Sequence, residues 1–337
     1  MGQLFARIAP MLATLVVLVI AITVLMPGFL DISIANGRLY GSPVDVLNRG
    51  APVALLAIGM TLVIATGGID LSVGAVMAIA GAVAARAITD GYGLSAALGM
   101  SLATGLACGL WNGFLVAVLR IQPIVVTLIL MVAGRGIAQL VTEGAILTFN
   151  HPGLAFLGSG AVGAVPVPIL IWIAAAILAG LVVRRTALGF MIEAVGVNPR
   201  ASFRAGVNTR ALLVAVYVVS GLCAAVAGVI VAADIRGADA NNAGLWLELD
   251  AILAVVIGGN SLLGGRFSIL ASLIGAMVTQ TVNTGILLAG FPPEYNLLIK
   301  ACIVLVILLI QSPRLGLARR IGARVGTRRR DPAGTAP

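Results

Sequence analysis

The sequence predicts an all-α polytopic membrane protein with about ten transmembrane helices and both termini in the cytoplasm. Of the 337 residues, 60% are hydrophobic and only 10% are charged, whereas soluble domains carry roughly 25% charged residues. The mean hydropathy is +1.13. Apolar stretches of about the 20 residues that cross a bilayer follow one another from Met11 to Gln311, and Lys and Arg divide unequally between alternate loops.

The predicted spans are the apolar runs that lie between turn residues. In chain order they cover 8–26, 50–66, 69–86, 94–119, 123–142, 165–183, 211–233, 249–264, 267–289 and 296–312. The first run follows Arg7, as in a signal peptide, but it is too long and lacks a small-residue cleavage site. We therefore expect it to be retained as a span.

The orientation follows from the excess of Lys and Arg in cytoplasmic loops. With both termini inside, fifteen of these residues fall on the cytoplasmic side and five outside, while Arg135 lies within the fifth span and is assigned to neither. We expect a transmembrane domain over 1–312 and a basic cytoplasmic tail over 313–337, in which seven Arg follow residue 313. A nucleic-acid-binding tail is the alternative, but no basic face with interleaved aromatic residues supports it.

The sequence argues against an enzyme. Its single histidine, His151, excludes a multi-histidine metal site within the chain. Its single lysine, Lys300, is not part of a phosphate-binding P-loop. The three cysteines lie in separate apolar runs without metal-ligand spacing. We therefore expect no catalytic residues, no metal and no cofactor.

Polar residues inside predicted spans are costly and are default candidates for function. The strongest candidates are Asp70 and Ser72, in a glycine-interrupted stretch at 67–74 that is echoed at 258–265. Paired helix breaks of this kind indicate a transport pathway. Asn112 and Asn283 are further pathway candidates, although each could equally make a hydrogen bond between helices.

Two other patterns concern helix packing and the cytoplasmic face. Gly105, Gly109 and Gly113 lie on one face of the fourth span and predict close approach of another helix. The largest inner loop, 184–210, has apolar residues at helical spacing from Leu188 to Val195. This spacing predicts a short amphipathic helix, which is either an ordinary surface helix or a docking helix for a partner protein.

Residues 48–74 closely resemble the permeases of ribose-type sugar ABC importers. The stretches 132–136, 186–196, 205–210 and 258–259 extend this resemblance over about residues 30–312. Within the family, residues 41–45, 232–250 and 291–294 are similar to galactofuranose importers.

The resemblance implies a permease in the bacterial inner membrane that imports galactofuranose or a related monosaccharide. The implied partners are a cytosolic ABC ATPase, a periplasmic sugar-binding protein and a second permease copy. It also implies that the inner-loop helix docks the ATPase, with coupling residues Leu188, Glu193, Gly196, Asn198 and Arg200. The outer loops 27–49 and 234–248 would then face the binding protein.

Two other classes of protein compete with this interpretation. A secondary transporter driven by an ion gradient would leave the polar inner loop unexplained. An intramembrane enzyme would need a His/Asp or paired-Asp constellation within the spans, whereas we expect only Asp70 to be intramembrane.

Overall fold

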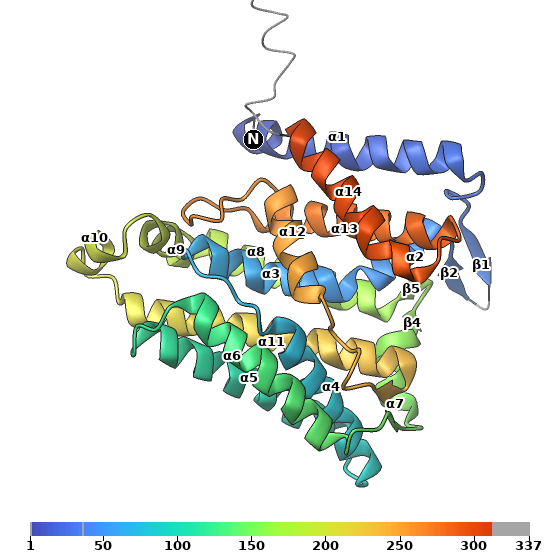
Figure 1. The fold of residues 1–337 in the computed structure, drawn as a ribbon, viewed down its shortest axis with the longest axis horizontal. Coiled ribbons are helices and arrows are strands. Elements are labelled where there is room, and N and C mark those ends of the chain that lie inside the picture. The colour runs from blue at the N-terminus through green and yellow to red at the C-terminus, as the bar shows by residue number, and fades with distance from the viewer. Residues whose placement is uncertain (1, 36, 312–337) are drawn as a thin grey trace, which may run out of the picture.

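The computed structural model describes residues 2–35 and 37–311, so the predicted basic tail over 313–337 lies outside the described residues. These residues form a bundle of fourteen helices with three short two-stranded sheets (Figure 1). The helices are α1 (Gly2–Leu25), α2 (Ser42–Arg49), α3 (Ala51–Ala65), α4 (Val73–Thr89), α5 (Leu94–Ala117), α6 (Pro123–Val141), α7 (Pro152–Ser159), α8 (Val167–Arg185), α9 (Leu188–Val197), α10 (Pro199–Arg204), α11 (Thr209–Ile235), α12 (Leu247–Ile257), α13 (Ile269–Leu288) and α14 (Pro293–Gln311).

Each of the ten predicted spans contains one of these helices, and α2, α7, α9 and α10 are the other four. Among the described residues, six helices are long and apolar enough to cross a membrane. A seventh candidate arises if α2 and α3, which meet at an angle of 44°, form one bent span. The helix predicted over 249–264 ends early, at Ile257, because Gly258 and Gly259 form a turn in which Gly259 has a φ of +70°.

The strands form short antiparallel pairs. β1 (Ser33–Ala35) pairs with β2 (Arg38–Tyr40), and β4 (Ala161–Val162) pairs with β5 (Val165–Pro166). β3 (Leu147–Thr148) pairs with β6 (Gly237–Ala238) and so joins the segments that follow α6 and α11. These strands fix loops at the end of the bundle away from α9 and α10 (Figure 1).

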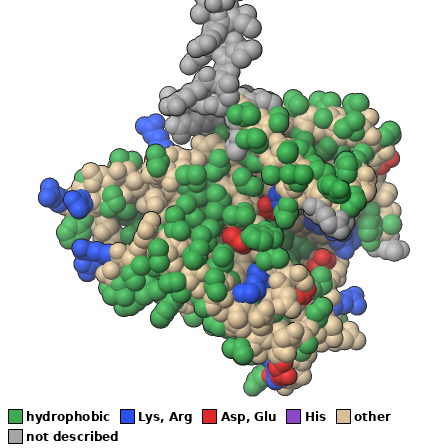
Figure 2. Space-filling view, in the orientation of Figure 1, with side chains coloured by type: hydrophobic (Ala, Val, Ile, Leu, Met, Phe, Trp, Pro, Cys, Tyr) green, Lys and Arg blue, Asp and Glu red, His purple; other side chains and the backbone are tan. Residues whose placement is uncertain are grey.

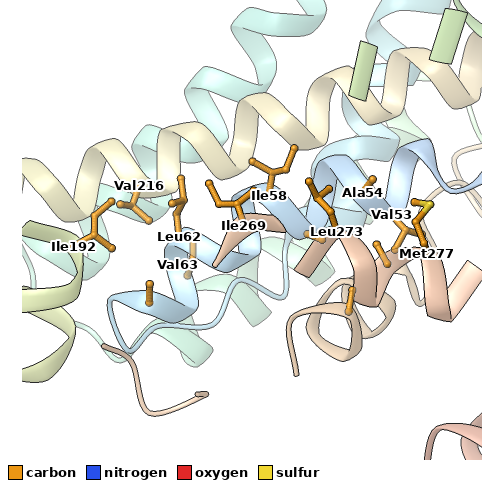
Figure 3. Packing of buried hydrophobic residues seen from close by; sticks show 14 of the residues in the cluster. Val53, Ala54, Ile58, Leu62, Val63, Ile192, Val216, Ile269, Leu273 and Met277 are labelled. Atoms are coloured by element: carbon orange, nitrogen blue, oxygen red, sulfur yellow. The ribbon is translucent and has the colours of Figure 1, made fainter. Parts of the chain in front are cut away.

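Helix α3 is the centre of the bundle. All of its residues are buried, and its sequence is apolar on every side, as expected for a helix surrounded by others. Figure 3 shows residues such as Ile58 and Leu62 of α3 packed against Leu273 of α13 and Val216 of α11. The same cluster includes Ile192, so helix α9 is attached directly to the core.

Helices α5 and α11 pack with their backbones in close contact. A Cβ at Gly105 would lie 2.5 Å from the carbonyl oxygen of Gly221, and one at Gly109 would lie 2.6 Å from that of Tyr217. At Gly113 it would lie 2.8 Å from the Cα of Val214. The close approach predicted from the spacing of these glycines is therefore confirmed, with α11 as the partner helix.

Candidate functional site

The break between α3 and α4 forms a buried polar turn. Residues 66–72 separate the two helices, and Asp70 lies within this turn with only 2% of its surface exposed. Ser72 donates to Asp70 Oδ1 from its backbone nitrogen at 3.0 Å and from its hydroxyl at 2.6 Å. The Ser220 hydroxyl of α11 donates to Asp70 Oδ2 at 2.8 Å. The carboxylate thus binds Ser72, the residue directly before α4, and ties the break to α11.

Asn112 of α5 extends this cluster. Its amide donates to the Ser72 hydroxyl at 2.8 Å, and it is itself buried. Its Oδ1 atom and the hydroxyl of the neighbouring Tyr217 are buried without a protein hydrogen-bond partner in the described part of the chain. The cluster therefore joins the α3–α4 break to α5 and α11 through hydrogen bonds. For Asn112, a hydrogen bond of this kind is the alternative to a place in the transport pathway.

The structure brings together three of the four predicted pathway residues and leaves the fourth apart. Asp70, Ser72 and Asn112 form one network, whereas Asn283 lies on α13 and is half-buried. Asn283 Oδ1 makes no hydrogen bond among the described residues. Sequence reasoning overlooked Ser220 and Tyr217, because a serine and a tyrosine in an apolar run carry no charge to mark them.

The two glycine-rich breaks lie side by side. The backbone nitrogen of Gly265 donates to the carbonyl oxygen of Ala65, the last residue of α3, at 2.9 Å. A Cβ at Gly264 would lie 3.0 Å from the nitrogen of Gly67. The segments 67–74 and 258–265, which the sequence relates only by similarity, are thus in physical contact at one end of α3.

Helix α9 closes on this same contact. A Cβ at Gly196 would collide with the carbonyl oxygen of Ala65 and would lie 2.6 Å from the nitrogen of Gly265. Glu193 Oε1 accepts from the backbone nitrogen of Phe267 at 3.4 Å, and Val195 is fully buried. One face of α9 is therefore fixed against both breaks.

The other predicted coupling residues lie around the exposed side of α9 and α10. Leu188 begins α9 and is 40% exposed. Asn198 caps α10 by accepting from the nitrogen of Ala201 at 3.0 Å, and Arg200 is exposed. The predicted short helix is thus confirmed, but its exposed side is apolar rather than polar, because Phe190 is 78% exposed while Glu193 faces the bundle.

A second arrangement, which sequence reasoning missed, involves residues 236–246, here called the inserted segment. Figure 1 shows it crossing the face of the bundle between α11 and α12, beside α6. The Arg135 guanidinium of α6 donates to the carbonyl oxygens of Ala240 at 3.0 Å and of Ala243 at 2.6 Å. Gln139, one turn further along α6, donates to Asn241 Oδ1 at 2.7 Å. The signal available in the sequence was Arg135 itself, a charge inside a span.

The carboxylates that follow the inserted segment are buried at the start of α12. Glu248 lies beside Gly74 of α4, and Asp250 forms an ion pair with Lys300 of α14. Asp250 and Lys300 are both largely buried, so each supplies the countercharge that the other needs. In residues 2–35 and 37–311, no group of three or more His, Cys, Asp or Glu side chains is placed to hold a metal ion.

Comparisons with known proteins give the family. Residues 42–308 match the family model described as branched-chain amino acid transport system / permease component. The galactofuranose transporter permease protein YtfT of Escherichia coli (strain K12) is 61% identical over 305 residues, which cover 90% of this chain and 89% of that protein. The ribose import permease protein RbsC of the same strain is 36% identical, with 90% and 93% covered.

A solved structure of an inward-facing ABC transporter of metal-chelate type aligns over 94% of this chain and 98% of that chain, with 16% identity and a TM-score of 0.45.

The resemblance to ribose-type importer permeases that residues 48–74 predict is confirmed by the relatives above. With at least six helices able to cross a bilayer, the chain is a multi-pass inner-membrane protein. It belongs to the family of permease components of branched-chain amino acid type transport systems.

Proposed function

We propose that the chain is the membrane-spanning permease of an ATP-driven importer of galactofuranose or a related monosaccharide. It forms the translocation pathway and couples to a separate ATPase. The observation that carries this proposal is the 61% identity to a galactofuranose transporter permease over 90% of the chain. The partners are a cytosolic ABC ATPase, a periplasmic sugar-binding protein and a second copy of the permease.

The topology we propose has ten spans with both termini in the cytoplasm. It counts α14, which has 19 residues, and the shorter helices α3, α4 and α12 as spans. Neighbouring helices bury much of the surface of α3, α4 and α12, and the breaks beside them complete the crossing. The unequal division of Lys and Arg, fifteen against five, supports this orientation. It places α9 and α10 on the cytoplasmic side.

Helix α9 is the element that docks the ATPase in this proposal. Phe190 and Val197 are 78% and 76% exposed, so α9 offers apolar side chains to a partner in an aqueous environment. Leu188, Asn198 and Arg200 frame this surface, while Glu193 and Gly196 hold α9 to the bundle.

The route by which the ATPase drives the pathway then follows from the packing. Because Gly196 abuts Ala65 and Gly265 without side chains between them, a displacement of α9 pushes directly on both glycine-rich breaks. The first of these breaks holds Asp70 and Ser72, whose hydrogen bonds join it to α5 and α11. We assign Asp70, Ser72 and Asn112 to gating of the pathway through this network, and Asn283 to a separate position on α13.

The test is uptake of labelled galactofuranose into vesicles that contain this chain, with and without its ATPase and binding protein. Uptake that requires all three components supports the importer. Uptake by the chain alone under an ion gradient contradicts it and favours a secondary transporter. Related monosaccharides, assayed in parallel, establish which sugar is carried.

A further inference from the structure

We propose that the inserted segment lines a water-filled sugar passage and that Trp246, with the amides of Asn241, Asn242 and Gln139, contacts the sugar as it passes. The inference rests on the proposed transport function and names the pathway residues for it. Its evidence is the depth of this segment, the polarity of its exposed side and the rigidity of its attachment.

The inserted segment lies well inside the bundle. Arg135, which binds Ala240 and Ala243, is six residues before the end of α6 at Val141, about 9 Å along the helix at 1.5 Å per residue. Gly244 packs against Gly74, in the first turn of α4, about 22 Å from the end of α4 at Thr89. Residues 240–244 therefore reach the depth at which the neighbouring helices cross the membrane.

Non-helical backbone at that depth is tolerated only where protein covers it or where it lines a water-filled cavity, because hydrocarbon cannot satisfy its polar groups. Gly237, Ala238 and Ala240 are buried in the bundle, whereas Asn241 and Asn242 are exposed and Trp246 is 50% exposed. Figure 2 shows charged side chains in the middle of this face, interrupting its hydrophobic surface. Contact of these amides with lipid would be costly, so this face borders water.

The exposed groups have the chemistry that binds a sugar. An indole ring offers an apolar face on which the C–H face of a sugar can stack, and carboxamides both donate and accept hydrogen bonds with hydroxyl groups. Gln139 itself lines a shallow, open depression on the surface of α6, together with Ala133, Gly136 and Leu140. Of the proposed sugar contacts, Gln139 is the one that borders this depression.

The segment is held in one conformation. Asp239 accepts from the backbone nitrogens of Asn241 and Asn242 at 3.0 and 3.1 Å and from the side-chain amide of Asn242 at 2.7 Å. Arg135 fixes the backbone from the α6 side. Trp246 has a φ of 66°, a left-handed conformation that is strained for a bulky residue and is found where surrounding contacts impose it. The indole is therefore presented by a rigid frame.

The first experiment compares uptake by the assembled importer carrying Trp246→Ala, Trp246→Phe or Trp111→Ala. Trp111 is the matched control, because it is 54% exposed but lies on α5, away from the inserted segment. We expect Trp246→Ala to lower the maximal uptake rate about tenfold through loss of stacking, and Phe to restore most of it. The half-saturating sugar concentration should stay unchanged, because the binding protein sets it. An equal effect of Trp246→Ala and Trp111→Ala would overturn the proposal.

The second experiment tests exposure to water without requiring uptake. Asn242→Cys and Leu110→Cys are treated with a membrane-impermeant thiol reagent, with the unsubstituted chain as background for its three cysteines. We expect modification at 242, slowed by galactofuranose when the importer is assembled, and none at the exposed apolar position 110. An Asn242→Cys variant that stays unmodified would refute the water-lined passage. Modification at 242 with no uptake by the unsubstituted importer would instead point to failure of the proposed function.

Discussion

Asp70 is an ionisable side chain in the interior of a membrane bundle, and its environment explains how it is accommodated. Both of its oxygens accept hydrogen bonds, from Ser72 on its own turn and from Ser220 on α11. Buried polar groups that lose their partners become costly. The residue therefore holds the break together as well as marking it.

Replacement of Asp70 tests this role. Asp70→Ala leaves the Ser72 nitrogen and the Ser220 hydroxyl without their acceptor, which should lower the free energy of unfolding by about 1–3 kcal/mol. Asp70→Asn keeps one acceptor and should cost less. Thermal unfolding of the detergent-purified chain measures both, with Asn283→Ala on α13 as the control. If Asp70→Ala unfolds at the temperature of that control, the network does not stabilise the break.

Gly196 is the residue at which α9 meets the central helix. Gly196→Ala adds a methyl group that collides with Ala65, and overpacking of this kind costs about 1–3 kcal/mol. We expect the variant to lose most of its uptake while the ATPase still co-purifies with it, because the exposed side of α9 is unchanged. Gly180→Ala on α8, where the methyl meets nothing within 4 Å, is the matched control. Normal uptake by Gly196→Ala would remove this contact from the coupling route.

At the scale of elements, the inserted segment depends on one side chain of a neighbouring helix. Arg135→Gln removes the guanidinium that binds the carbonyl oxygens of Ala240 and Ala243. Hydrogen bonds to charged groups contribute about 1.5–3 kcal/mol, so the segment should open at least about tenfold more often. Trypsin cleavage after the exposed Arg236 reports this opening. Arg135→Lys, which keeps the charge, should be intermediate, and cleavage of all three proteins at one rate would contradict the clamp.

The elements also show what the sequence can and cannot predict. Apolar runs located a helix in every predicted span, and helical spacing located α9, because both depend on local residue type. The inserted segment is different, since the sequence predicts an outer loop over 234–248 and nothing local indicates that it folds back against α4 and α6. The pathway candidates divided in the same way. Asp70 and Asn112 could be found from their polarity, but Ser220 and Trp246 acquire their positions only through tertiary packing.

At the scale of the whole molecule, the charge distribution predicts which end faces the cytoplasm. Phe190 on α9 and Ser33 in β1 are both exposed, and the two elements lie at opposite ends of the bundle (Figure 1). Phe190→Cys should therefore react with an impermeant thiol reagent only in inside-out vesicles, and Ser33→Cys only in right-side-out vesicles. The unsubstituted chain corrects for its own cysteines. Reaction of both variants from the same side would place α9 and β1 on one face of the membrane and refute the proposed topology.

The glycine contacts between α5 and α11 have a consequence for how this chain can change in length. Each residue advances an α-helix by about 100°, so one residue inserted between Gly105 and Gly113 would turn a larger side chain into the backbone of α11. No side chain in this contact could yield to accommodate it. Insertions and deletions should instead be confined to turns such as 90–93, where a Cβ at Gly91 or Gly93 meets nothing within 4 Å. Homologues are therefore expected to differ in length at such turns and to keep the spacing of Gly105, Gly109 and Gly113 fixed. Tags and fused domains should be tolerated at the same turns.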